Sequence, residues 1–310
     1  MGKDGLDFKV VEIPQPIFAD PTNVFRIGQT LIDTCHADDA SVSVLVEQLD
    51  RGDLRGIKEV IVTHPHVDHV TASAALPRLA EMPHTVFSGA ENILRDLYGY
   101  LSGAQRQQEG VLVGGDEGMR QLVRAVAAKY WPTDRQYLDI NISRIVKDGE
   151  EIEADGTVLK AVYTPGHEAN HMSLFHEPSG TLFSGDLVAN NAHFVVAPLT
   201  PDIGQYERSL HKVLALNPRL IVPSHGKQIP DAVEHLQKCL ANVQTMKIRI
   251  VDIVRSHGSA PLPLILEELF GDVDPMRYRV MSVGTACYLQ CLHEEGMIVF
   301  DREALVASLQ

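Results

Sequence analysis

The first two thirds of the chain alternate short apolar runs with longer stretches in which apolar residues recur at helical spacing. Residues 59–63, 158–163 and 181–183 are compact apolar runs bounded by turn-forming residues, which predicts buried strands. Residues 40–49 and 203–216 have apolar positions three and four apart, which predicts helices. The same patterns predict strands within residues 8–35 and at 85–87, 145–146, 151–153, 172–175 and 220–222, and a helix at Ala72–Leu79. This alternation is typical of an α/β fold.

A segment from about residue 91 to residue 139 breaks the alternation and is rich in helical patterns. It holds Trp131, the only tryptophan of the chain, together with several tyrosines. Aromatic side chains offer large apolar contact areas. We therefore expect this helical insertion to form a lid over the functional site or a dimer surface. The alternative is a peripheral helical hairpin that packs on the sheet.

The last eighty or so residues follow a different pattern, which predicts a second, smaller domain. Three helical patterns are followed by one short apolar run, at residues 231–257, 261–270, 279–293 and 296–300. Helix, helix, helix and a hairpin strand is a winged-helix-like order. The sequence thus predicts a main domain at residues 1–230 and a helical, winged-helix-like domain at residues 231–310.

The charge pattern bears on which partners the chain can bind. The formal net charge is −14, and residues 256–310 hold three basic residues against eight acidic ones. A surface that binds nucleic acid should be basic. The pattern therefore argues against nucleic acid as a partner, for the winged-helix-like domain as for the whole chain.

Cysteine use and hydropathy bear on the location of the chain. The four cysteines contain no C-x-x-C pair, which fits free thiols in a reducing compartment. No apolar run approaches the roughly 20 residues that span a bilayer, and the first residues do not form a secretion signal. We expect a cytoplasmic protein that is not held in a membrane.

The most informative motif follows the apolar run at residues 59–63. His64, His66, Asp68 and His69 fall within six residues, and Pro65 disfavours a helix at the first of them. Imidazole and carboxylate groups are the ligands that zinc and other borderline divalent metals prefer. The motif therefore predicts a metal site at the end of a strand.

Three later strand ends each carry one further donor next to a glycine. His167 follows Gly166, Asp186 follows Gly185 and His225 precedes Gly226, and an apolar run comes before each. Glycine permits the tight turns that bring such side chains close to a shared point. We therefore expect all of these strand ends to meet at one site.

The order HxHxDH, His, Gly-Asp, His resembles the metallo-β-lactamase superfamily, over roughly residues 8 to 230. The resemblance implies an αββα sandwich with metals at one edge of the two sheets. It also implies the following roles: His64, His66 and His167 hold a first metal, Asp68, His69 and His225 hold a second, Asp186 bridges the two, and Asp33 orients a ligand from behind.

Differences from other family members indicate which branch of the superfamily the chain resembles. His66 argues against the di-iron flavoproteins, and Asp186 argues against the true β-lactamases, which lack that bridging carboxylate. The pattern favours the branch that includes glyoxalase II, lactonases and enzymes that cleave RNA or phosphoesters. A tyrosine typical of quorum-quenching lactonases is missing after Asp186. The C-terminal part resembles that of the lactamase-β-like protein 2 subgroup.

The resemblance implies a hydrolase with two divalent metal ions, with zinc as first choice and iron or manganese as alternatives. A hydroxide that bridges the metals would attack an ester-like carbonyl, a thioester or a lactone, of a small molecule. Asp68 and Asp186 would be the catalytic carboxylates. His193 follows Asn190-Asn191 on a polar stretch and is a candidate for substrate contact or proton donation.

Three alternatives stay open from the sequence. The same site could serve a phosphodiesterase or ribonuclease, or a persulfide dioxygenase with a single iron. A ligand-binding regulatory protein could also keep the hydrolase scaffold, because a fold does not decide a function. A homodimer formed through the insertion is one candidate assembly.

Overall fold

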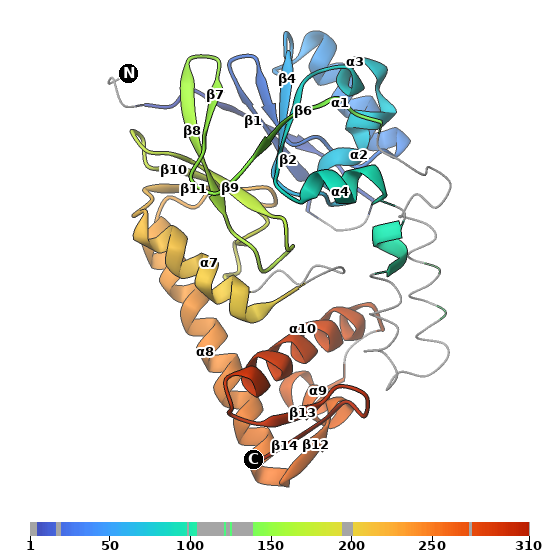
Figure 1. Cartoon of the computed structure of the whole chain (residues 1–310), viewed down its shortest axis with the longest axis vertical. Helices are drawn as coiled ribbons and strands as arrows, with labels where there is room; N and C mark the ends of the chain where they lie inside the picture. The colour runs from blue at the N-terminus through green and yellow to red at the C-terminus, as the bar shows by residue number, and fades with distance from the viewer. Residues whose placement is uncertain are drawn as a thin grey trace.

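Two β-sheets stacked face to face form the upper part of the molecule in Figure 1. The computed structural model describes residues 5–16, 20–97, 99–103, 121, 125, 139–193, 201–272 and 275–309. The first sheet has the order β1-β2-β3-β4-β5-β6 and the second the order β11-β10-β9-β8-β7. The predicted α/β class is therefore correct.

The first sheet comes from the N-terminal half of the chain. Its strands are β1 (Lys9–Ile13), β2 (Thr22–Ile27), β3 (Thr30–Ile32), β4 (Glu59–Val62), β5 (His84–Phe87) and β6 (Ile142–Val146). The strands β1, β2 and β3 are antiparallel neighbours, whereas β3, β4, β5 and β6 run parallel. Because β3, β4 and β5 are parallel, their carboxyl ends lie at the same edge of the sheet.

The second sheet comes from the chain after residue 150. Its strands are β7 (Glu151–Ala154), β8 (Thr157–Tyr163), β9 (Met172–His176), β10 (Thr181–Gly185) and β11 (Leu220–Pro223). The strands β7 to β10 form an antiparallel meander, and β11 pairs with β10 in parallel. The parallel pair again places two strand ends side by side.

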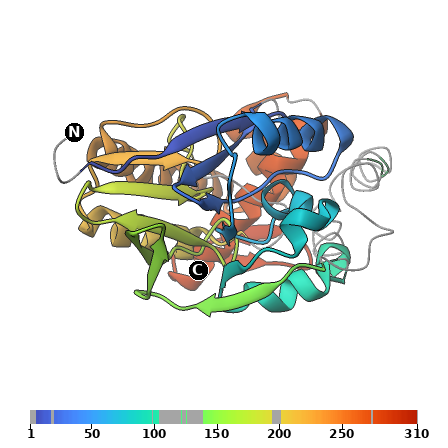
Figure 2. The ribbon, with the colours of Figure 1, turned by 90° about the horizontal axis from the view of Figure 1, so that it is seen from above.

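Successive side chains of each strand lie on opposite faces of the sheet and so pack into different layers. Ile61 lies in the apolar cluster between the sheets, whereas Val60 and Val62 pack toward the helices on the outer face. Phe183 and Leu182 divide in the same way in the second sheet. Figure 2 shows the blue strands of the first sheet and the green to yellow strands of the second as separate layers. The result is the expected αββα sandwich.

Helices cover the outer faces of both sheets. The first sheet is covered by α1 (Asp39–Arg51), α2 (Val67–Ala75), α3 (Pro77–Ala80) and α4 (Ala90–Arg95), and the second by α7 (Ile203–Ala215) and α8 (Ala232–His257). The prediction of a helix at Ala72–Leu79 is wrong in its bounds. Pro65 keeps the residue before it out of a helix, but it does not restrain residues from Val67 onward. Asp68 and His69 therefore lie in the first turn of α2.

The C-terminal part continues from α8, which ends at Gly258 in a left-handed conformation (φ 69°). It contains β12 (Ser259–Pro261), α9 (Leu262–Phe270), α10 (Pro275–Glu294), β13 (Val299–Asp301) and β14 (Val306–Ser308), and the strands form a sheet of order β12-β14-β13. The predicted helices are present, but the three-residue strands β12 and β14 were not predicted. Side chains of α7, α8, α9 and α10 share one apolar cluster. The winged-helix-like assignment and the domain boundary at residue 230 stay predictions.

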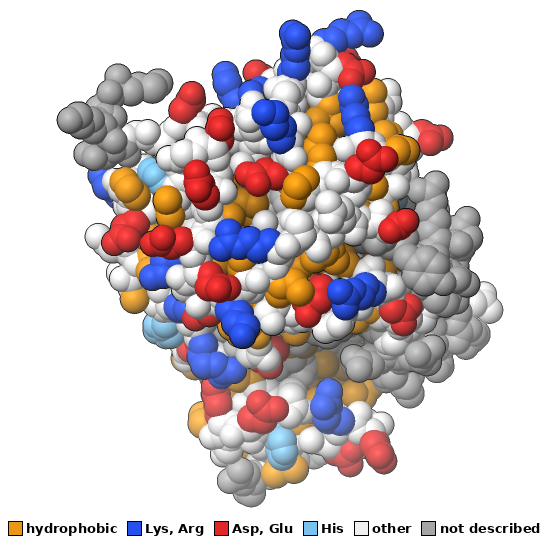
Figure 3. Space-filling view, turned by 45° about the horizontal axis from the view of Figure 1, so that its top comes forward, with side chains coloured by type: hydrophobic (Ala, Val, Ile, Leu, Met, Phe, Trp, Pro, Cys, Tyr) orange, Lys and Arg blue, Asp and Glu red, His pale blue; other side chains and the backbone are white. Residues whose placement is uncertain are grey.

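Charges are mixed on the described surface. On the face in Figure 3, Lys and Arg side chains alternate with Asp and Glu side chains, and no broad basic patch is visible among the described residues. None of the described helices combines the length and apolar character that crossing a membrane requires. Most of the predicted insertion at residues 91–139, and with it the lid or dimer hypothesis, lies outside the described residues.

Two ion pairs that share the buried Lys247 join three parts of the C-terminal half. Lys247 Nζ on α8 lies 2.7 Å from Glu207 Oε2 on α7 and 2.6 Å from Glu295 Oε1 just after α10. Burial lowers the pKa of Lys247, but the two carboxylates outweigh it and raise that pKa above its ordinary value. Both carboxylates thus favour the charged amine and hold the three helices together.

We expect Lys247→Met to destabilise the protein by about 2 kcal/mol, because Glu207 would keep a partly buried charge without its cation. Urea unfolding followed by circular dichroism measures the change. Lys238→Met is the matched control, since Lys238 lies on the same helix and is exposed. Equal stability of the two variants would contradict the role of the two ion pairs.

Candidate metal centre

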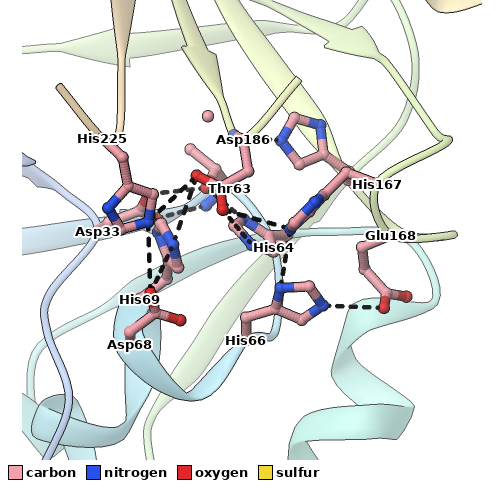
Figure 4. Close-up of polar contacts among 12 residues, drawn as sticks. Asp33, Thr63, His64, His66, Asp68, His69, His167, Glu168, Asp186 and His225 are labelled. Carbon is pink, nitrogen blue, oxygen red and sulfur yellow. Dashed lines mark hydrogen bonds and ion pairs between the residues drawn. The ribbon is translucent and has the colours of Figure 1, made fainter. Parts of the chain in front are cut away.

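Five segments bring seven candidate ligands to the edge where the strand ends meet (Figure 4). His64 and His66 follow β4, Asp68 and His69 begin α2, and the remaining three follow strands of the second sheet, His167 after β8, Asp186 after β10 and His225 after β11. Their donor atoms fall into two groups, within each of which all atoms lie within 4.8 Å of one another. The structure therefore brings together every ligand that the sequence predicted.

The first group is formed by His64, His66, His167 and Asp186. His167 Nε2 lies 3.0 Å from His66 Nδ1 and 3.3 Å from Asp186 Oδ2. His64 Nε2 lies 3.9 Å from the same carboxylate oxygen. All four side chains are buried, so this group can surround a small cation with three imidazoles and one carboxylate.

The second group is formed by Asp68, His69 and His225. Asp68 Oδ2 lies 3.3 Å from His225 Nε2 and 3.6 Å from His69 Nε2. Both of these nitrogens also lie 3.6 Å from Asp186 Oδ1. Asp186 therefore directs one oxygen at each group, which is the placement that a bridging carboxylate needs.

A separate observation indicates that the donor atoms suit divalent cations. Four buried ligand atoms have no hydrogen-bond partner in the described part of the structure: His64 Nε2, His69 Nε2, Asp68 Oδ2 and Asp186 Oδ1. Buried polar atoms are normally satisfied, and leaving them without a partner is costly. Nitrogen and oxygen atoms that converge in this way match the preferences of zinc and related metals.

The histidines of the site differ in the direction in which their pKa values are shifted. Burial, with the neighbouring histidines adding to it, holds the pKa of His64 well below its ordinary value. Burial also opposes the charged forms of His69 and His225, but Asp68 and Asp186 outweigh it, so the pKa of His69 is well above normal and that of His225 is about 9. The two carboxylates have lowered pKa values in return, against the effect of their own burial. Without cations, protons on His69 and His225 balance the carboxylate charge.

Asp33, to which the family resemblance assigns the orientation of a ligand, lies behind the second group. It accepts hydrogen bonds from Thr63 N at 2.7 Å, from Thr63 Oγ1 at 2.7 Å and from His69 Nδ1 at 3.1 Å. Thr63 Oγ1 in turn lies 3.0 Å from His64 Nδ1. Asp33 is fully buried and has a left-handed backbone (φ 60°). Its carboxylate therefore fixes the ring of His69 directly and that of His64 through Thr63.

Comparison with known proteins agrees with this geometry. Residues 18–225 match the sequence model of the metallo-beta-lactamase superfamily. The chain belongs to this superfamily. Solved structures of the superfamily share the fold over nearly the whole chain. A metallo-beta-lactamase family protein from Thermus thermophilus covers 99% of both chains with a TM-score of 0.70 and 20% identity. A beta-lactamase domain protein from Burkholderia ambifaria covers 98% of this chain and 92% of its own, with a TM-score of 0.75 and 18% identity.

Curated relatives of the chain include one named as a probable metallo-hydrolase. The chain is 29% identical to a beta-lactamase-like protein 2 homolog of Caenorhabditis elegans over 49% of its length and 50% of that protein. It is 24% identical to the probable metallo-hydrolase YqjP of Bacillus subtilis over 94% of both chains. The chain thus spans about half the length of the C. elegans relative and nearly all of the B. subtilis one. Family membership and these relatives support hydrolase activity.

His171 supports the superfamily site in a way that the sequence did not reveal. Its Nε2 accepts a hydrogen bond from Asp186 N at 3.0 Å, and its Nδ1 lies 2.8 Å from Thr164 Oγ1. Burial, together with His167, lowers its pKa to about 3. A Cβ at Gly185 would lie 2.4 Å from His171 Nε2, so only glycine allows this approach. The neutral ring therefore fixes the turn that presents Asp186. The spacing of four residues from His167 was the available signal.

Two asparagines hold the loop of His225, and the sequence did not single them out for this. Asn23 Nδ2 donates to the carbonyls of Pro223 at 3.0 Å and Gly226 at 2.8 Å. Asn190 accepts from Lys227 N at 2.7 Å and donates to Lys227 O at 2.8 Å. Nothing in the sequence distinguishes them from ordinary turn asparagines, because both contacts join segments that are far apart along the chain.

His193 and Cys35 lie outside the two ligand groups. The side chain of His193 is exposed, and its backbone N–H donates to Asn191 Oδ1 at 3.0 Å. Its predicted role in substrate contact or proton donation stays a prediction. Cys35 is fully buried in the cluster beneath α1 and α2, and its burial, aided by Asp38 and Asp68, raises the pKa of its thiol. Cys35 therefore packs as a small apolar residue.

Proposed function

We propose that this chain is a hydrolase that uses two divalent metal ions to cleave an ester-like carbonyl, a thioester or a lactone, of a small molecule. One observation carries the proposal: the two oxygens of Asp186 face two different groups of buried ligands. A single carboxylate shared in this way can hold two metal ions side by side. The presence of the second group also favours this interpretation over a dioxygenase with one iron.

The roles of the residues follow from their positions. His64, His66 and His167 would hold one cation, Asp68, His69 and His225 the other, and Asp186 both. When bound, the cations would supply a nucleophile derived from water at neutral pH and would polarise the substrate carbonyl. Asp68 directs its Oδ2 at His69 and His225, where it would help to hold the second cation and would orient the attacking water. His193 would contact the substrate or protonate the leaving group.

The proposed substrate class has support from one relative. The chain is 27% identical, over 46% of its length, to a protein of Aspergillus fumigatus named atrochrysone carboxyl ACP thioesterase. That match covers 45% of the relative. A thioester carbonyl is therefore the first substrate to test. Zinc is the first metal to test, because three imidazoles and a carboxylate suit it well.

The test is initial hydrolysis rates on an acyl thioester, an acyl lactone and a bis-aryl phosphodiester. Chelated protein and protein reloaded with zinc, manganese or iron run in parallel. We expect thioester or lactone turnover that is lost on chelation and restored by metal. Turnover of the phosphodiester alone would replace the proposal with a phosphodiesterase or ribonuclease. No turnover on any substrate would favour a regulatory protein or a dioxygenase.

A further inference from the structure

Each ligand group contains one histidine whose outward ring nitrogen faces a buried carboxylate (Figure 4). In the second group, His69 Nδ1 donates to Asp33 Oδ2 at 3.1 Å. In the first group, His66 Nε2 donates to Glu168 Oε2 at 3.2 Å. Both carboxylates belong to residues that are 0% exposed. Glu168 thus repeats, on the other side of the site, the contact that Asp33 makes.

Glu168 is held from two parts of the chain. It directly follows His167 in the turn after β8, and Asn170 N approaches its Oε1 at 3.4 Å. The hydroxyl of Tyr100 donates to its Oε2. Tyr100 lies in the helical residues 99–103 and packs against the apolar cluster that includes Val67 at the start of α2. The carboxylate is therefore fixed in place and does not depend on His66 alone for its position.

The two contacts use opposite ring nitrogens. A carboxylate that accepts the proton of one ring nitrogen leaves the lone pair of the other nitrogen free to bind metal, and it makes that nitrogen more basic. At His66 the free lone pair is then on Nδ1, which lies 3.0 Å from His167 Nε2 in the first group. At His69 it is on Nε2, which faces Asp68 and Asp186. Each carboxylate therefore makes its direct histidine contact in a different group, and Asp33 reaches His64 of the first group only through Thr63.

We propose that Glu168 is a positioning residue for the first group, as Asp33 is for the second, so that each cation has its affinity set by its own buried carboxylate. This rests on the proposed two-metal site but not on any substrate. Three neutral histidines and one shared aspartate supply little negative charge to balance a bound cation. The carboxylate of Glu168 therefore also adds negative charge next to the first group. Asp68 supplies that charge in the second group.

The test is metal binding by metal-free protein, followed with a competing zinc chelator and by cobalt(II) absorption. We expect Glu168→Gln to raise the Kd of one ion by roughly 10- to 100-fold and to leave the other within about threefold. Asp33→Asn should weaken mainly the other ion, because its direct contact is with His69 and it reaches His64 only through Thr63, with the complementary change in the cobalt spectrum. Glu168→Gln with both Kd values unchanged, or with both raised equally, would overturn the proposal.

Glu177→Gln is the matched control, because it makes the same substitution at an exposed glutamate that directly follows β9; both Kd values should stay within about threefold of the wild type. Circular dichroism of each metal-free variant checks folding. A measurement on the wild type needs no variant: nitrogen NMR of the zinc-bound protein should show the ring proton of His66 on Nε2 and that of His69 on Nδ1. The opposite tautomer at His66 would overturn the proposal.

These readouts separate the inference from the proposed function. Selective weakening of one ion by Glu168→Gln would stand even if no ester were hydrolysed. Conversely, ester hydrolysis by a variant whose two Kd values match those of the wild type would refute only the role of Glu168.

Discussion

Asp186→Ala is expected to lower hydrolytic turnover by roughly 1,000-fold or more. The substitution removes a ligand from both groups at once, because Oδ2 faces His64 and His167 while Oδ1 faces His69 and His225. Loss of several kcal/mol of charge stabilisation at a metal site corresponds to a rate loss of this size. The measurement is kcat/KM on the best thioester or lactone substrate, with metal content determined in the same samples.

A matched variant makes the result interpretable. Asp231→Ala replaces an exposed aspartate that precedes α8 and makes no capping hydrogen bond there, so turnover should match that of the wild type. Asp186→Asn keeps the size of the side chain but loses its charge, and it should fall between alanine and the wild type. A loss below tenfold in Asp186→Ala would argue against a shared carboxylate.

The metal-free protein is expected to lose stability between pH 6.5 and pH 9 relative to the zinc-bound protein. The pKa of His225 rises from 6.5 to about 9 in the folded state, because Asp186 and Asp68 outweigh its burial, and the pKa of His69 is also raised. A raised pKa stabilises the fold fully below pH 6.5, and that contribution is lost as the pH rises through 9. Zinc replaces these protons, so the difference should reach roughly 3 kcal/mol for His225 alone.

Urea unfolding at pH 6.5, 7.5 and 9, with chelator or with zinc, measures this difference. Groups far from the site, including Cys239, Cys287 and Cys291, contribute equally to both forms and cancel. His64 and His171 have lowered pKa values, so their titration falls below this pH range. In the metal-free form, His225→Gln should flatten the pH dependence. Parallel pH profiles for the two forms would show that protons do not replace metal in this site.

The sequence alone could predict the ligand set because each ligand follows a strand end or sits in a tight turn. His64 comes after a compact apolar run, and Gly166, Gly185 and Gly226 mark the turns that carry the other ligands. These signals are local, so they survive without knowledge of the fold. The start of α2 was misplaced because proline restricts the residue before it more strongly than the residues after it.

The supporting contacts could not be predicted, because they are not local. Glu168 meets Tyr100 and His66 only once the two sheets are stacked. A glutamate next to a ligand is normally expected to face solvent, and no pattern marks this one as buried. Asn23 acts across the two sheets on the His225 loop. The strands β12 and β14 are three residues long, which is too short for an alternating pattern to appear.

The order of the ligands along the chain determines which ligand group can form first during synthesis. Asp186 is the last ligand of the first group along the chain. The second group also needs His225, whose backbone pairs with Thr22 near the start of the first sheet. A chain emerging from the ribosome can therefore complete the first group before the second. Its last ligand arrives together with the strand pairing that joins the two ends of the sandwich. The second ion would then be acquired only by a chain in which the segment of His225 has also paired with Thr22.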